Sequence, residues 1–305
     1  MHPQTLGLVG YGEVGRIFAS GLQPHFDAVY AWDTRFAEAA RREQPALQAV
    51  SDAGVQACSS LQALCARSEL LISAVTASNT LTVAEEAALY LRPGTIFLDL
   101  NSASPATKQQ ACALVQAAGG HYVEAGIMTS VPPYGIRVPM LLGGPMAAAL
   151  VPLLQGMGMD ARAVSPEIGV ASAIKMCRSV MIKGLEALVI ESYTTARAYG
   201  VEAHVLPTLA ETFPSIDWEQ SGAYFFSRVV AHGQRRAEEM CESARTVAET
   251  GFAPVMARAI ADKQQWVADQ ARAGVFDGIA GNAAWQVYAD ALLAQARPPR
   301  DDAIN

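Results

Sequence analysis

Short apolar runs alternate with helix-like segments over the first 165 residues of the chain. These runs lack the regular polar positions that mark a half-exposed strand. Strands of this kind are typical of a parallel sheet that helices cover on both faces. The pattern therefore predicts an α/β domain over residues 1–165, with a Rossmann-type, doubly wound sheet. Its strands are expected at 5–12, 27–33, 69–75, 95–100, 121–127 and 139–144.

Helical segments follow these strands. One reaches about residue 22, a second is rich in Ala, Glu and Arg after residue 33, and a third is NTLTVAEEAALYL (79–91). The next is expected to begin at Ser104-Pro105. A serine there accepts hydrogen bonds from the free N–H groups of a helix start, and proline suits the first turn.

The pattern changes after residue 165. Residues 167–199 contain no proline, and only Gly169 and Gly184 interrupt a helical pattern that stops at Gly200. This predicts one long linking helix of about 50 Å at 1.5 Å per residue, enough to join two domains. Beyond it, Pro207 and Pro214 are expected to separate helical segments. The second predicted domain is all-α and covers 166–305, with further helices over 233–250, 254–272 and 281–296.

Composition narrows the possible partners. The formal net charge is −7 at pH 7, which disfavours nucleic acid or an anionic membrane as the main partner. Five cysteines without a CxxC motif or Cys/His cluster predict reduced thiols and no structural metal, as in a cytoplasmic protein. No apolar window is long enough to span a membrane, and a strand-like run from Thr5 argues against a signal peptide.

A glycine-rich turn follows the first predicted strand. Gly10, Gly12 and Gly15 match G-x-G-x-x-G between the strand LGLV and the helical run RIFASGL. The first glycine allows a tight turn, the second lets the backbone approach a pyrophosphate, and the third lets helix and strand pack closely. The free N–H groups of the helix start then bind the phosphates. The motif in this context predicts dinucleotide binding.

The end of the second predicted strand bears on the choice of dinucleotide. Asp33 lies where a carboxylate accepts hydrogen bonds from a ribose 2′-hydroxyl and repels a 2′-phosphate, which favours NAD. Arg35 follows two residues later and can hold a 2′-phosphate, so NADP remains possible.

Four stretches of the chain resemble the β-hydroxyacid dehydrogenase superfamily, which includes 3-hydroxyisobutyrate and 6-phosphogluconate dehydrogenases. They lie within residues 4–200 and read GLVGYGEVG (7–15), SAVTASNT (73–80), FLDLNSASP (97–105) and GVASAIKMCRS (169–179). HGQRRAEEM (232–240) is similar to bacterial members described as phosphogluconate-dehydrogenase-like. The resemblance implies an NAD(P)-dependent oxidoreductase that transfers a hydride between the cofactor and a small hydroxy acid or its oxo or semialdehyde form. A homodimer is expected because the long helix and the Ala-rich, apolar all-α half offer a packing surface.

The resemblance assigns roles to individual residues. Lys175 matches the family's catalytic lysine and would act as general acid/base. Ser179 stands where the family has asparagine and would bind the substrate hydroxyl or orient Lys175, while Ser102 would lie near the nicotinamide or the substrate. The expected cofactor contacts are Gly10, Tyr11, Gly12, Glu13, Val14, Gly15, Asp33, Arg35, Val75, Thr76, Asn79 and Asn101. The expected substrate contacts are Arg178, Asn101, Thr129, Ser130, His232 and Arg235.

Two stretches depart from the family pattern or leave alternatives open. EAGIMTS (124–130) replaces D-A-P-V-S-G-G, so the substrate pocket is expected to be remodelled. Lys175 and Arg178 could instead form a solvated helix face, and Lys183 is interpreted as structural or as an ion-pair partner. Arg235 could pair with Glu239 rather than bind an anion.

Two other functions are compatible with the same motifs. Imine reductases share the expected architecture, but they usually lack a lysine at the place of Lys175. A protein that senses a dinucleotide without catalysis is the third hypothesis. The glycine motif together with Ser102 and Lys175 argues against it, whereas the replaced S-G-G and asparagine favour it.

Overall fold

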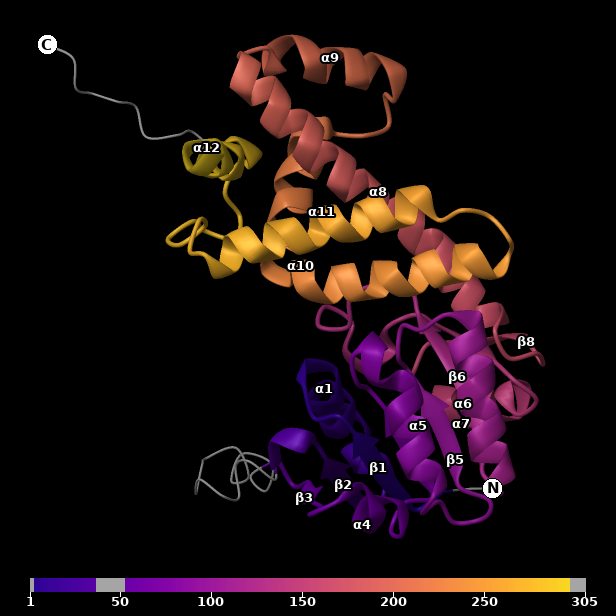
Figure 1. Cartoon of the computed structure of the whole chain (residues 1–305). Helices are drawn as coiled ribbons and strands as arrows, with labels where there is room; N and C mark the ends of the chain where they lie inside the picture. The colour runs from indigo at the N-terminus through magenta and orange to yellow at the C-terminus, as the bar shows by residue number, and fades with distance from the viewer. Residues whose placement is uncertain (1–2, 37–52, 297–305) are drawn as a thin grey trace, which may run out of the picture. The chain divides into compact units, whose positions relative to one another are not determined.

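The computed structural model describes residues 3–36 and 53–296 (Figure 1). The chain forms two compact units, which divide between Cys177 and Arg178, inside helix α8 (Val170–Tyr199). This division lies twelve residues beyond the domain boundary predicted at 165/166. The reason is local, since the N–H groups of Gly169 and Ala171 donate to the carboxylate of Glu124 and tie the start of α8 to the sheet.

Eight strands of the described residues form one sheet in the order β3-β2-β1-β4-β5-β6-β7-β8. All neighbours are parallel except β6 and β7. The Rossmann-type sheet predicted from the sequence is therefore confirmed. The strands are β1 (Thr5–Val9), β2 (Ala28–Trp32), β3 (Gln56–Ala57), β4 (Leu70–Ser73), β5 (Ile96–Asp99), β6 (His121–Ile127), β7 (Met140–Gly143) and β8 (Ala161–Ser165). The sequence did not predict β3, which has two residues, or β8, whose side chains are mostly exposed.

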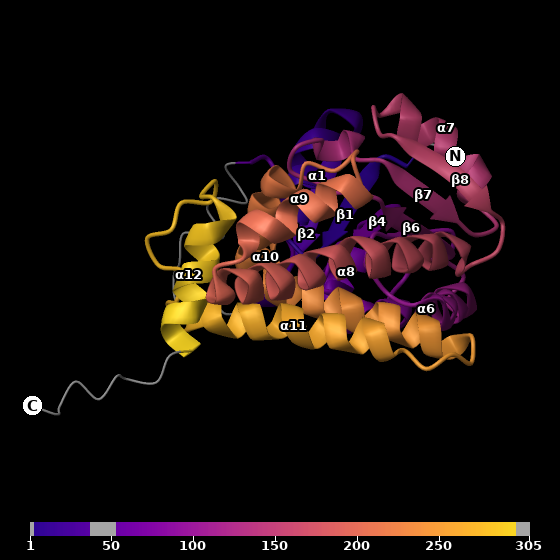
Figure 2. The ribbon, with the colours of Figure 1, turned by 90° about the horizontal axis from the view of Figure 1, so that it is seen from above.

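Helices cover both faces of this sheet, as Figure 2 shows with α1 and α7 on one side and α6 on the other. Phe18 and Leu150 lie in the core on the first face, and Val83 and Val115 lie in the core on the second. Ser104 accepts a hydrogen bond from the N–H of Thr107, which confirms the predicted helix cap. The helices are α1 (Glu13–Leu22), α4 (Leu61–Cys65), α5 (Thr80–Ala88), α6 (Pro105–Ala117) and α7 (Ala147–Gly156), with short 3₁₀ turns η1 (Gln23–His25), η2 (Ala77–Asn79) and η3 (Gly135–Arg137). The helix predicted after residue 33 falls largely on residues 37–52, outside the described residues.

The second unit is all-α, as predicted. Besides the greater part of α8 it contains α9 (Glu202–Thr212), α10 (Trp218–Glu249), α11 (Val255–Arg272) and α12 (Trp285–Ala296). Helices α10 and α11 run side by side in both views (Figures 1 and 2). Their apolar core with α8 and α12 is rich in aromatic rings, among them Tyr193, Phe226, Trp285 and Tyr288.

Several helix boundaries differ from the prediction for identifiable reasons. Helix α8 begins after Gly169 because this residue has φ +108°, which an α-helix does not accommodate. Gly200 has φ +67° and ends α8 as predicted. Pro207 lies inside α9 rather than between helices. The helix predicted from residue 233 is the second half of α10, which is kinked at His232 (φ −138°, ψ 15°).

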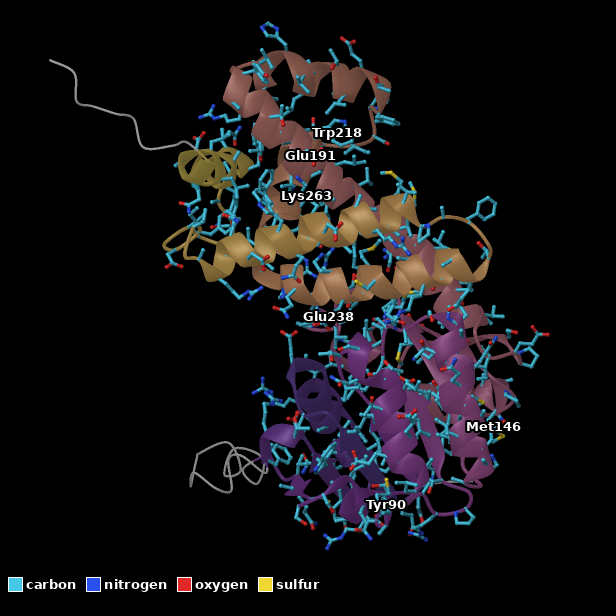
Figure 3. All side chains as sticks on the ribbon, viewed as in Figure 1. Tyr90, Met146, Glu191, Trp218, Glu238 and Lys263 are labelled. Carbon is cyan, nitrogen blue, oxygen red and sulfur yellow. The ribbon has the colours of Figure 1, made fainter. Side chains whose placement is uncertain are left out.

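Charged side chains join the helices of the second unit. Figure 3 labels Lys263 of α11 and Glu191 of α8, and their Nζ and Oε2 atoms lie 2.7 Å apart. Deeper in the unit, Arg236 of α10 forms a two-point ion pair with Glu186 of α8. Gln264 of α11 donates to the same carboxylate at 3.2 Å, so three helices meet at one buried charge.

Candidate functional site

The glycine-rich turn between β1 and α1 has the shape that a pyrophosphate requires. Gly10 has φ +89°, and a Cβ there would lie 2.5 Å from the carbonyl oxygen of Ala74. A Cβ on Gly15 would collide with the carbonyl of Gly10, so only glycine lets α1 pack this close to β1. Beside Gly12 the nearest atom to such a Cβ would be Arg35 Nη2 at 4.0 Å. This open space at the start of α1, where Gly12 offers no side-chain cap, fits a phosphate bound by helix N–H groups.

The other predicted residues of this turn have different surroundings. Tyr11 is buried with its ring centroid 5.8 Å from that of Phe36, and burial raises the pKa of its hydroxyl. Val14 packs against the core on the same face of the sheet. Glu13 is exposed in the first turn of α1, where the helix dipole favours a carboxylate. Tyr11 and Val14 therefore support the turn from inside.

The carboxylate of Asp33, just after β2, is already engaged. The N–H of Tyr11 donates to its Oδ2 at 2.8 Å, and Arg35 donates from Nε to Oδ1 and from Nη2 to Oδ2, both at 2.8 Å. Burial alone would raise the pKa of Asp33, but the hydrogen bonds from Arg35 and Tyr11 lower it to about 2. An acceptor for a ribose hydroxyl thus lies in contact with a donor for a 2′-phosphate, and the Arg35 side chain is 61% exposed.

The loop after β4 is attached to the loop after β5 through Asn101. Asn101 Oδ1 accepts from the N–H of Val75 at 2.7 Å, and its Nδ2 donates to Ser73 Oγ at 2.9 Å. Thr76 precedes the η2 turn, where its hydroxyl accepts from Asn79 Nδ2 at 2.8 Å. The predicted contacts Val75, Thr76, Asn79 and Asn101 therefore come together, and the buried Asn101 holds the loop in place.

A buried ion pair, which the sequence did not reveal, supports Asn101 from inside the sheet domain. Lys108 Nζ lies 3.0 Å from Asp99 Oδ1, and both side chains are 1% exposed. Tyr122 donates to the other carboxylate oxygen at 2.6 Å, and the N–H of Asn101 donates to Oδ1 at 2.9 Å. Burial and the Asp99 carboxylate raise the pKa of Tyr122. The signal in the sequence was an aspartate at the end of an apolar strand, together with a lysine in the following helix.

The strand register aligns these polar groups. Val9 pairs with Ser73, Ser73 with Asp99, and Asp99 with Glu124, so one row crosses β1, β4 and β5 at their carboxyl ends and β6 at its middle. In doubly wound sheets ligands bind outside these ends. The glycine turn, the loop after β4 and the loop that carries Asn101 and Ser102 all follow this row.

Lys175 lies at the same edge of the first unit. It is half-buried on α8, and a Cβ added to Gly126 of β6 would lie 3.5 Å from the Lys175 Cβ. Beyond β6, Thr129 is exposed and Ser130 half-buried in the loop that replaces the family's S-G-G. The structure thus brings Lys175 to the carboxyl end of the sheet with Ser102, Thr129 and Ser130 in the adjoining loops.

The candidates in the second unit have different roles in the structure. Arg178 is exposed, whereas Ser179 is buried and accepts a hydrogen bond from Lys183 Nζ at 3.1 Å. Lys183 also pairs with Glu239 at 2.8 Å, which agrees with its interpretation as an ion-pair partner. Because Ser179 is buried, the helix face that contains it is not uniformly solvated.

The basic residues of α10 have different partners and different burial. Arg235 Nε lies 3.9 Å from Glu239 Oε1, as the alternative interpretation predicted. The neighbouring Arg236 is buried against Glu186, so it does not join an anion-binding surface. His232 occupies the kink of α10. Within the described parts of the chain, no group of three His, Cys, Asp or Glu side chains could hold a metal ion, and no helix is long and apolar enough to cross a membrane.

A family model matches part or most of each unit. Residues 5–162, just over half of the chain, match the family model of the NAD binding domain of 6-phosphogluconate dehydrogenase, and residues 196–267 match the domain of unknown function DUF1932. A conserved hypothetical protein from Sinorhizobium meliloti is 33% identical with TM-score 0.75, covering 97% of each chain.

Two enzymes share the fold at lower identity. The 3-hydroxyisobutyrate dehydrogenase of Mycobacterium tuberculosis, solved with L-serine, has TM-score 0.68 at 15% identity and covers 95% of this chain and 99% of its own. A reductive aminase from Aspergillus terreus, solved with NADPH and ethyl levulinate, has TM-score 0.56 at 18% identity and covers 96% and 99%. At these identities the likeness concerns the fold alone. The family match and the glycine turn together show that the chain belongs to the family of the 6-phosphogluconate dehydrogenase NAD-binding domain, within the β-hydroxyacid dehydrogenase superfamily, with NAD(P) as its cofactor.

Proposed function

We propose that the protein is an NAD(P)-dependent oxidoreductase that interconverts a small hydroxy acid and its oxo or semialdehyde form, with Lys175 as general acid/base. The observation that carries this proposal is the position of Lys175 beside Gly126, at the carboxyl end of the sheet that also bears the glycine turn. A half-buried lysine there would be able to transfer a proton near a bound nicotinamide, which supports the proposal.

The residues of the first unit divide the work of binding and proton transfer. The glycine turn would hold the pyrophosphate, and Asp33 with Arg35 would meet the adenosine ribose. The bound cofactor supplies or accepts the hydride. Lys175 would take the proton from the substrate hydroxyl in oxidation and return it in reduction. Ser102 would hydrogen-bond the substrate or the nicotinamide amide from the loop after β5.

Substrate recognition is expected to differ from that of the dehydrogenases with an S-G-G segment. Here Met128 and Thr129 stand in that segment. Their side chains would cover backbone N–H groups that glycines would leave open to a carboxylate. Arg178, which is exposed on α8, is the proposed carboxylate partner because a planar guanidinium binds both carboxylate oxygens at once. Arg235 is a weaker candidate because Glu239 lies nearby.

Reduction of a C=N bond is the second candidate function. It is supported by the fold shared with the Aspergillus terreus reductive aminase over almost the whole chain. The two reactions differ in the proton that moves, since oxidation of a hydroxyl group needs a base whereas reduction of an imine needs a proton donor.

The test is a substrate screen with the purified protein. NAD⁺ and NADP⁺ are each combined with a panel of small hydroxy acids, and NADPH with a panel of cyclic imines, beside the variant Lys175→Ala. We expect oxidation of a hydroxy acid that falls at least about 100-fold in the variant, within the range that general acid–base groups contribute. Undiminished turnover in Lys175→Ala contradicts the mechanism. Reduction of imines alone supports the second candidate, and cofactor binding without any turnover supports a sensing role.

A further inference from the structure

Glu124 in β6 is a fully buried carboxylate that accepts hydrogen bonds from backbone N–H groups. Its side chain is 0% exposed, and its Oε1 accepts from the N–H of Gly169 at 2.7 Å and from that of Ala171 at 3.0 Å. The other oxygen, Oε2, has no hydrogen-bond partner among the described residues. A buried carboxylate is costly unless it is compensated. Here the compensation is the N-terminal end of α8, whose dipole and free N–H groups favour a negative charge.

The next residue on the same face of β6 is Gly126, two positions along the strand. A Cβ there would lie 3.0 Å from the carbonyl oxygen of Ala171 and 3.5 Å from the Cβ of Lys175. The glycine therefore lets the first turns of α8 lie directly on the strand. Gly143 of β7 makes room for Glu124 in the same way, since a Cβ on it would collide with the Glu124 carboxylate.

These two contacts hold the same segment of α8 from consecutive inward positions of one strand. Glu124 binds the helix start by hydrogen bonds, and Gly126 receives the helix at Ala171 and Lys175. The position of Lys175 relative to the carboxyl edge of the sheet is therefore set within the first unit, by β6. This geometry explains why the compact units divide after Cys177 rather than at the start of α8.

We propose that Glu124 is a positioning residue for Lys175, acting through the N-terminal end of α8. The proposal rests on the proposed function of Lys175 as the general acid/base. Glu124 does not touch the substrate, and its effect is to fix the distance between the lysine and the nicotinamide. A displacement of about 1 Å in a reacting group lowers the rate by up to about 100-fold, so the effect should fall on turnover rather than on binding.

The experiment compares three substitutions in the full chain. Glu124→Leu removes both acceptors, Glu124→Gln keeps one acceptor oxygen without the charge, and Gly126→Ala adds a Cβ under Ala171 and Lys175 without altering any charge. Gly156→Ala is the matched control, because a Cβ there meets nothing within 4 Å. The readouts are kcat, the KM of substrate and cofactor, the dissociation constant of the dinucleotide, and the melting temperature.

We expect kcat to fall by about tenfold or more in Glu124→Leu and Gly126→Ala, with the dinucleotide dissociation constant within about twofold of wild type. Glu124→Gln should recover most of the turnover, because its oxygen still accepts from the two N–H groups. If Glu124→Leu does not fold, Gly126→Ala and Glu124→Gln decide the question. Folded variants with lower melting temperature but wild-type kcat would show that Glu124 only stabilises the fold, and would overturn the proposal.

A second readout separates this proposal from the proposed function. Acetic anhydride modifies accessible lysines, and peptide mass spectrometry follows the rate at Lys175 without any turnover. In Glu124→Leu and Gly126→Ala we expect this rate to change by at least about threefold, with Lys263 unchanged as internal control, since a moved lysine has new neighbours. If the wild type turns over no substrate but this change occurs, the proposed function fails and the positioning stands. An unchanged rate in both variants overturns the positioning.

Discussion

The two compact units bury their polar side chains in different places. In the first unit Ser73, Asp99 and Glu124 lie in one row across the sheet, and the loops after β4 and β5 begin directly after Ser73 and Asp99. In the second unit the buried Glu186 and Arg236 join helices to one another, with Gln264 as a third partner. Both arrangements compensate the charges that they bury.

The two arrangements differ in the parts of the chain to which the buried groups are hydrogen-bonded. In the first unit, Asp99 orders the backbone of Asn101, and Asn101 in turn binds the N–H of Val75, so the chain of bonds ends on the loops after β4 and β5, where we propose that the cofactor binds. In the second unit the bonds run from helix to helix and end there. The buried polar groups of the sheet therefore order the loops at its carboxyl edge, whereas those between helices join the helices that pack together.

The most disruptive test of this comparison is Lys108→Met. It leaves the Asp99 carboxylate buried without its cation, a change that costs about 3–5 kcal/mol when one partner of a buried pair is removed. We expect this loss in the free energy of unfolding, measured by urea titration, together with weaker dinucleotide binding because Asn101 loses its support. The double variant with Asp99→Asn should be more stable than Lys108→Met alone. A loss below about 1 kcal/mol would contradict this role of the pair.

The matching substitution in the second unit is Arg236→Met. It leaves Glu186 buried with Gln264 as a remaining partner, and we expect a loss of about 3 kcal/mol, at the lower end of the range for a broken buried pair. Dinucleotide affinity, measured by nucleotide fluorescence, should stay within about twofold of wild type, because the hydrogen bonds of this group join helices of the second unit. A large loss of affinity would show that the contrast between the units is wrong.

The smallest effect is expected at the edge of the cofactor site, where the polar groups are least buried. Arg35→Ala should weaken NADP binding by about tenfold and NAD binding much less, since a charged hydrogen bond contributes about 1.5–3 kcal/mol when buried and less at an exposed guanidinium. Asp33→Ala should weaken NAD more than NADP. Equal effects on both dinucleotides would reject these roles.

The contribution of Asp33 to NAD binding should not depend on pH over the usual range. The pKa of Asp33 is about 2, below its ordinary value, so the carboxylate is ionised from about pH 5 to about pH 8 in both the free protein and the unfolded chain. The contribution of the Asp33–Arg35 pair to stability is present above about pH 4 and is lost only as the pH falls towards 2. The ratio of the NAD dissociation constants of Asp33→Ala and wild type should therefore be the same at both ends of the range.

Local signals predicted much of the fold. The apolar runs gave the central strands of the sheet, and the glycine spacing gave the turn between β1 and α1. Gly200 and Ser104 gave helix ends, because a positive φ and a capping hydroxyl are properties of single residues. The edge strands β3 and β8 escaped prediction because neither carries a long apolar run, and they exist through pairing with β2 and β7.

The candidate site was predicted less completely. The sequence found Asp33 and Arg35 but did not show that each is the other's partner, and it found Asn101 without its bonds to Val75 and Ser73. It did not reveal that Lys108 and Glu124 support this region from inside the protein. Their roles depend on partners 9 and 45 residues away in the chain, as between Lys108 and Asp99 and between Gly169 and Glu124.

The sequence by itself determined the class of fold, the family and the cofactor, because these depend on patterns that lie within single strands, helices and turns. The tertiary structure decided which polar residues face the loops and which are used up inside the protein. Lys175 and Lys183 lie two turns apart on one helix, yet the first lies against the sheet at Gly126 and the second is buried between Ser179 and Glu239. Their difference comes from the elements packed around α8, and no pattern within the helix contains that information.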